Sequence, residues 1–175
     1  HFDEPKIMGI INLSEDSFYE NDAQTSSKEI IQKIEGFIKN GANIIDLGGA
    51  STRPNAKLPS LKVELSRVIP ILQVVRKKFP KILISVDTVR SKVAEEALMN
   101  GADLINDVSG GYSDKKILSI VQKYRCPYIL THNLEHSVNS EKLASQNTIK
   151  EVIRFFSKRI QELQSIGIHD IIIDP

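Results

Sequence analysis

The chain has 175 residues, of which 41% are hydrophobic and 26% charged, as expected of one soluble domain with a sizeable core. Its 23 Lys and Arg residues are balanced by 22 Asp and Glu residues, and only 6% of residues are aromatic, which argues against a nucleic-acid partner. The one cysteine, Cys126, excludes an intramolecular disulfide framework, and no apolar run approaches the roughly 20 residues of a membrane span, so we expect a cytoplasmic, soluble protein.

Short β-branched runs alternate with amphipathic stretches along the chain. In chain order we expect a strand at 7–11, a helix at 26–39, a strand at 44–47, a helix at 61–79, a strand at 82–86, a helix at 91–100, a strand at 104–108, a helix at 114–124, a strand at 128–130, a helix at 148–165 and a strand at 171–173. Ser26 with Glu29, and Thr148 with Glu151, are spaced as capping boxes for two of these helices. Pro70 predicts a kink, or two shorter helices, within 61–79.

One short unit recurs three times. Gly41, Gly101 and Gly167 each end a predicted helix and are followed by a turn, a buried strand and a polar residue. Buried strands joined by helices indicate a parallel sheet, and such repeats favour an α/β fold of the (β/α)8 TIM-barrel type, with about six β/α units in residues 1–175 and no second domain. The alternative is an open doubly wound sheet, which is weakened because no Gly-x-Gly-x-x-Gly follows the first strand.

Polar residues stand where every predicted strand ends. They are Asn12, Asp46, Asp87, Asn106 with Asp107, His132 with Asn133, and Asp174. Single members of this set could simply cap the following loop, but six polar strand ends on one rim favour a binding site. Carboxylates and carboxamides complement a flat heterocycle with a ring N–H, an amine and a carbonyl, such as a pterin or a guanine-like ring. The residues by themselves indicate that class of ligand and no narrower one.

The first two loops add candidate anion and metal ligands. Residues 48–54 read Gly-Gly-Ala-Ser-Thr-Arg-Pro, in which the glycines allow close backbone approach and Arg53 offers donors suited to phosphate. Asn12 is followed by acidic residues, an arrangement that could ligate Mg²⁺. Each loop taken alone would more often be a solvated connection than a ligand site.

Five motifs in this order resemble the dihydropteroate synthase family. They are residues 7–18, 46–54, 85–88, 105–110 and 174–175, the last resembling the start of an Asp-Pro-Gly motif. The resemblance implies a barrel enzyme that joins 6-hydroxymethyl-7,8-dihydropterin pyrophosphate to p-aminobenzoate with Mg²⁺, and that is a sulfonamide target. It also suggests a homodimer, and the missing initiator Met permits fusion behind a pterin pyrophosphokinase domain.

The same resemblance assigns roles to individual residues. Asp87, Asn106 and Asp174 would hold the pterin ring, and Asn12 would contact the metal and the pyrophosphate. The loop residues with implied contacts to the pyrophosphate, the aromatic amine or the bound substrates are Thr52, Arg53, Pro54, Asp16 and Phe18. The expected catalytic residues are Asn12, Thr52, Arg53 and Asp87.

The chain also departs from the family pattern. Glu15 stands where the family usually has Pro, Ala50 where it has Glu, and Thr131 where it commonly has Met. Strands seven and eight of the barrel are expected beyond residue 175, in a longer polypeptide. Two alternatives stay open: a pterin-binding methyltransferase that presents methyltetrahydrofolate to a corrinoid protein, and a non-catalytic relative.

Overall fold

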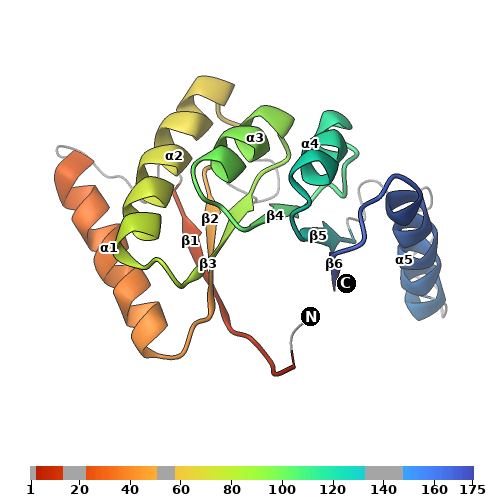
Figure 1. The fold of residues 1–175 in the computed structure, drawn as a ribbon, viewed down its shortest axis with the longest axis horizontal. Coiled ribbons are helices and arrows are strands. Elements are labelled where there is room, and N and C mark those ends of the chain that lie inside the picture. Colours follow the sequence, from red (N-terminus) through yellow and green to blue (C-terminus); the bar gives the residue numbers. More distant parts are fainter. Residues whose placement is uncertain (1–2, 14–22, 51–57, 133–147) are drawn as a thin grey trace.

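The computed structural model describes residues 3–13, 23–50, 58–132 and 148–175 (Figure 1). Strands and helices alternate in this part of the chain. They are β1 (Met8–Asn12), α1 (Ala23–Lys39), β2 (Ile44–Gly48), α2 (Leu61–Lys78), β3 (Leu83–Asp87), α3 (Ser91–Met99), β4 (Leu104–Asp107), α4 (Lys116–Tyr124), β5 (Tyr128–Thr131), α5 (Thr148–Ser165) and β6 (Ile171–Asp174). The predicted elements are therefore all present, with ends that differ by up to three residues. None of the helices among the described residues is long and apolar enough to cross a membrane.

Two helix predictions need correction. Helix α1 begins at Ala23, so Ser26 lies inside the helix and does not start it. Helix α2 runs unbroken through Pro70, so the division into two shorter helices, one of the two expected outcomes, does not occur. Proline has no N–H to donate to the carbonyl group four residues before it. Because Pro70 is exposed, water can donate to that carbonyl group instead. Helix α2 instead starts at a side-chain cap, because the Ser60 hydroxyl accepts a hydrogen bond from Val63 N at 3.3 Å.

The six strands form one parallel sheet in the order β1-β2-β3-β4-β5-β6. A doubly wound sheet would reverse its strand order at a switch point, and this sheet does not. Consecutive parallel neighbours are instead the arrangement of a (β/α)8 barrel, of which these strands form part. In Figure 1 the helices are ranged along the outside of the curved sheet, with β1 at one edge and β6 at the other.

The two faces of the sheet carry different side chains. The outward face packs under the helices in the main core, which includes Ile45, Val86 and Leu130. The opposite face carries a smaller apolar cluster of Ile44, Leu104 and Ile129 near the strands' amino ends. Because side chains alternate along a strand, the residues two positions after these also lie on the inner face. The polar residues near the carboxyl ends therefore form two sets, an inner set on the face away from the helices and an outer set on the face that packs under them.

The three glycines of the recurring sequence unit each lie at the carboxyl end of a helix. Gly41, Gly101 and Gly167 have φ values of 94°, 101° and 84°. The residue after each of them donates its backbone N–H to a carbonyl five residues back, at 2.9–3.0 Å, which is the Schellman arrangement. Helix α4 ends in the same way with Arg125 at φ 51°, so this fourth copy carries no glycine and could not be found from the repeat.

Close packing of α1 on β1 depends on Gly9. A Cβ atom at Gly9 would lie 2.5 Å from Cδ2 of Phe37, a residue packed against the main core. We therefore expect Gly9→Ala to lower the free energy of unfolding by about 1–3 kcal/mol, measured by chemical denaturation of the protein that carries this chain. Gly36→Ala is a matched control, because no atom lies within 4 Å of its added Cβ. It should raise stability by about 0.5–1 kcal/mol, since Ala favours a helix over Gly. Equal effects of the two substitutions would contradict the packing argument.

Candidate active site

A row of polar groups lines the inner face at the carboxyl ends of the strands. The strand pairing places Asn12 beside Gly48, Gly48 beside Asp87, and Asp87 beside Asn106. Gly48 leaves open the space between two of these side chains. A Cβ there would lie 3.4 Å from Asp87 Oδ2 and 3.5 Å from Asn12 Oδ1, so both oxygens face the same point. Three of the predicted site residues are thus brought together at one rim.

Asp46 lies one layer below this row. It was expected at the end of its strand, but β2 continues to Gly48, and Asp46 pairs with Ile10 on one side and Ser85 on the other. Asp46 is 3% exposed, and its Oδ2 accepts a hydrogen bond from Asn106 Nδ2 at 3.1 Å. Burial raises the pKa of Asp46, while the nearby Ser85 hydroxyl and the Asn106 amide oppose that rise.

Three buried polar atoms of this inner set make no complete hydrogen bond in the described part of the chain. They are Asp46 Oδ1, Ser85 Oγ and Asn106 Oδ1. The first two lie near each other on paired residues, close enough to affect the carboxyl but without full hydrogen-bond geometry. Asn106 Oδ1 is likewise left without a hydrogen-bond donor from the described residues. A buried acceptor of this kind is stabilised when a ligand or a water molecule supplies a donor.

Asp87 carries the most perturbed carboxyl group of the row. Burial, together with the negative charges of Asp46, Asp107 and Glu64, raises its pKa to about 7. A carboxyl that titrates near neutrality at the mouth of a barrel is typical of a functional site. It can accept N–H donors when ionised, and ligand binding at this position should depend on pH.

The last strand adds Asp174 to the row. Its Oδ2 accepts a hydrogen bond from the Thr131 hydroxyl at 3.3 Å. Thr131, which stands where the family commonly has Met, therefore contacts Asp174, a residue predicted to bind the pterin. His132, considered a pocket member from sequence, points elsewhere. Its ring packs edge-on against Phe155 of α5, with centroids 4.9 Å apart. Strand alternation explains this, because His132 follows an inward-facing residue.

Asp107 belongs to the outer set and is structural. It is fully buried and accepts hydrogen bonds from Ser109 N at 2.8 Å, Gly111 N at 2.8 Å and the Tyr128 hydroxyl at 2.8 Å. Burial and the Asp107 charge raise the pKa of Tyr128, which therefore remains a hydrogen-bond donor. Asp107 thus fixes the turn after β4 and, with it, the position of Asn106. From the sequence, Asn106 and Asp107 had both been assigned to the polar rim of the barrel.

A buried ion pair connects helix α2 to the segment that follows β3. Glu64 of α2 is 1% exposed, bonds the Thr88 hydroxyl at 2.6 Å and pairs with Arg90. Arg90 also donates to the carbonyl of Pro59 at 2.6 Å. On the other side, Arg67 of α2 donates to the carbonyl of Gly49 at 3.1 Å. These residues were missed from sequence because charged groups at helical spacing usually face solvent.

Several predicted site residues fall outside the described residues. They are Asp16, Phe18, Thr52, Arg53 and Pro54, together with the strand-end residue Asn133. Their assignments stay predictions from the sequence. Among the residues that the structure does describe, no group of three or more His, Cys, Asp or Glu side chains could hold a metal ion.

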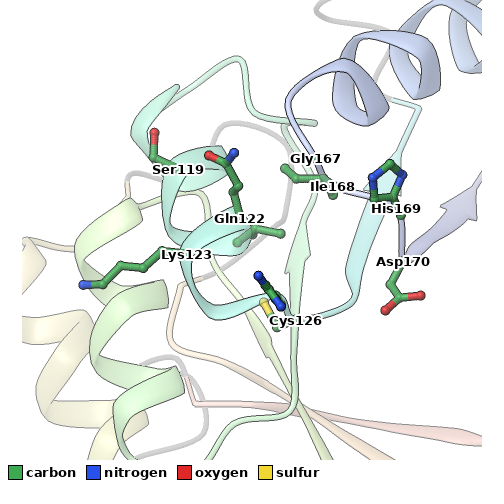
Figure 2. A pocket seen from close by; sticks show the side chains of 10 residues that line it. Ser119, Gln122, Lys123, Cys126, Gly167, Ile168, His169 and Asp170 are labelled. Carbon is green, nitrogen blue, oxygen red and sulfur yellow. The ribbon is translucent and has the colours of Figure 1, made fainter.

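A cavity of about 720 Å³ lies at the opposite rim (Figure 2). Its lining comes from α4 and from the segments that precede β5 and β6, including Gln122, His169 and Asp170. Cys126 also lines it, and burial raises the pKa of this thiol to about 11, so it stays protonated at neutral pH. Active sites of barrels form at the carboxyl ends of the strands, so this cavity is on the wrong side for catalysis.

The family model for pterin binding enzymes matches residues 8–175. The chain belongs to the pterin-binding enzyme family. It is 39% identical over 173 residues to the folic acid synthesis protein fol1 of Pneumocystis carinii, covering 97% of this chain and 23% of that protein. It is also 38% identical over 172 residues to the dihydropteroate synthase of Synechocystis, covering 97% of this chain and 59% of the relative.

Solved structures of this pterin-binding family superpose on the chain. A dihydropteroate synthase from Clostridium difficile, crystallised in the presence of pteroic acid, matches with a TM-score of 0.88 and 34% identity, over 100% of this chain and 66% of that one. The Xanthomonas albilineans dihydropteroate synthase with 4-aminobenzoic acid matches with a TM-score of 0.86 and 31% identity, over 99% and 62%. The chain thus spans about 60% of the Synechocystis relative and of the Xanthomonas structure.

Proposed function

We propose that the enzyme containing this chain is a dihydropteroate synthase, which condenses 6-hydroxymethyl-7,8-dihydropterin pyrophosphate with p-aminobenzoate. The observation that carries the proposal is the inner row of Asp87, Asn106 and Asp174 at one rim of a pterin-binding barrel. These residues supply the carboxylate and amide acceptors that the N–H edge of a pterin requires. The names of the similar proteins, and the pteroic and 4-aminobenzoic acids named with two of their structures, support the same reaction.

The proposed reaction is a substitution at the methylene carbon of the pterin. The C–O bond to pyrophosphate breaks with its electron pair on the leaving group, and the amine of p-aminobenzoate forms the new C–N bond and then loses a proton. Positive charge develops on the pterin methylene, and the ionised carboxylates of the row would stabilise it. No protein nucleophile is required, so catalysis rests on positioning the pterin and the amine.

Mg²⁺ would assist departure of the pyrophosphate by neutralising its charge. The chain's own ligand would be Asn12, whose exposed amide oxygen faces the same space as Asp87. Mg²⁺ is commonly held by one or two protein oxygens together with substrate phosphates and water, so a single amide ligand fits this ion. Thr52 and Arg53 are the proposed ligands of the pyrophosphate, from the loop that follows β2.

The remaining assignments follow from the family. A sulfonamide that mimics p-aminobenzoate would compete at the same site, in a cytoplasmic homodimer. Fusion to another folate enzyme is supported by the Pneumocystis relative, of which this chain covers only 23%. Such a fusion would join a pterin pyrophosphokinase to the synthase that consumes its product.

The test is an assay of pyrophosphate release by the full-length protein with the pterin pyrophosphate and Mg²⁺. We expect release to depend on p-aminobenzoate and to match dihydropteroate formation mole for mole. Methyl transfer from methyltetrahydrofolate to a corrinoid protein, without pyrophosphate release, would instead identify the methyltransferase alternative. Binding of the pterin with no turnover would identify a non-catalytic relative.

A further inference from the structure

The Asn106 side chain is held in one orientation by a residue beneath it. Asn106 Nδ2 donates to Asp46 Oδ2 at 3.1 Å, and Asn106 Oδ1 is left buried without a partner among the described residues. Asp46 Oδ2 is the acceptor of this bond, so it holds the nitrogen end of the amide toward itself. The amide oxygen is then left as a buried acceptor that a ligand can pair with.

Asp46 has no evident role in stabilising the fold. It is 3% exposed, and no Lys, Arg or His in the described part of the chain forms an ion pair with it. Burial of an unpaired carboxyl is unfavourable, and it raises the pKa of Asp46. Asp46 also lies a layer deeper than Asp87, in register with Ile10 and Ser85. The one complete hydrogen bond of its side chain to the described residues is the bond to Asn106.

We propose that Asp46 is a positioning residue that sets the ligand selectivity of the site, by holding the Asn106 oxygen free to accept from the exocyclic amine of a pterin. The inference rests on the proposed function. Asp87 is the register neighbour of Asn106, so carboxylate and amide oxygens stand side by side on adjacent strand ends. A ligand must therefore offer adjacent N–H donors, as the guanidine-like edge of a pterin does. A ring with a carbonyl in place of the amine is rejected.

The test compares two pteridines that differ at this one group. Isothermal calorimetry on the full-length protein would measure the affinities of 6-hydroxymethylpterin and of 6-hydroxymethyllumazine, which carries a carbonyl in place of the exocyclic amine. The natural protein should prefer the pterin. Asp46→Asn, which keeps the size but lets the Asn106 amide turn over, should reduce the ratio of the two affinities by about tenfold, the scale of leaving one buried polar group unpaired.

Ser85→Ala is the matched control. Ser85 is buried in the same layer and pairs with Asp46 in the sheet, but its hydroxyl makes no complete hydrogen bond to any described residue, Asn106 included. It should leave the ratio of affinities unchanged. Asp46→Ser serves as a second variant if thermal melting shows that Asp46→Asn is unfolded, and the same fall is expected.

Each outcome has a distinct meaning. A natural protein that prefers the pterin, with an unchanged ratio in the folded Asp46 variant, would overturn the positioning role and leave the proposed function intact. Equal weakening of both ligands would show a merely structural role for Asp46. A natural protein that binds neither pteridine would overturn the proposed function and this inference with it.

Discussion

Asp87→Asn is expected to weaken pterin binding by about 1–3 kcal/mol at pH 8, the contribution of a hydrogen bond to a charged acceptor. Burial and neighbouring carboxylates raise the pKa of Asp87 to about 7, so at pH 6 the natural residue is already largely protonated. Since N–H donors bind the ionised form better, affinity should rise as the pH rises from 6 to 8. Calorimetry at several pH values should show this rise for the natural protein and a flat profile for Asp87→Asn.

The same group makes stability depend on pH in the opposite sense. In the unfolded chain the Asp87 pKa returns to about 4, so between pH 4 and 7 the folded state holds a proton that the unfolded state has lost. The contribution of Asp87 to the free energy of unfolding is therefore largest below pH 4 and falls as the pH rises to 7. Asp87→Asn should remove this slope in the ligand-free protein.

Asp170→Asn is the control for both experiments. Asp170 precedes β6, so it lies at the opposite rim beside the cavity of Figure 2. The substitution should leave the affinity and its pH profile as they are. An Asp87→Asn protein that binds the pterin as tightly as the natural one at pH 8 would remove Asp87 from the binding site.

Arg90→Met is expected to have the largest effect on stability. It would leave the carboxylate of Glu64, which is 1% exposed, without its cation, and would free the carbonyl of Pro59. Breaking a buried ion pair from one side costs about 3–5 kcal/mol, because the remaining charge stays in a medium of low polarity. Chemical denaturation of the full-length protein, monitored by circular dichroism, measures this loss.

A double variant separates the charge effect from simple loss of packing. Glu64→Gln keeps an acceptor for the Thr88 hydroxyl, which donates to Glu64 Oε1 at 2.6 Å, and removes the stranded charge. Combined with Arg90→Met, it should recover more than half of the lost stability. Lys123→Met breaks an exposed pair with Glu95 and a cation–π contact with Tyr124, and should change stability far less. If the double variant were less stable than Arg90→Met, the stranded charge could not be the cause.

The sequence predicted most of the fold because its signals are local. The repeated Gly at helix ends, the β-branched runs and the amphipathic stretches each act within a few residues, and strand order follows from their regular succession. The start of α1 was wrong, because the capping spacing of Ser26 with Glu29 can also occur inside a helix. The unbroken course of α2 through Pro70 depends on that residue being exposed, which periodicity did not reveal.

The candidate site was predicted less completely, and strand alternation explains why. Asn106 and Asp107 are adjacent in sequence, yet one faces the barrel interior and the other the helices. Because side chains two residues apart on a strand share a face, the position of Asp87 would also have identified Ser85 as an inner residue. Glu64 and Arg90 could not be found in that way, since their pairing depends on how α2 packs beside the β3 end.

The most direct test of the whole account is a crystal structure of the full-length protein with 6-hydroxymethylpterin bound. We expect the pterin ring to lie on the inner face of the sheet, with its N–H groups within hydrogen-bond distance of Asp87, Asn106 and Asp174. A pterin bound instead in the cavity between α4 and the start of β6, against Gln122 and His169, would contradict it.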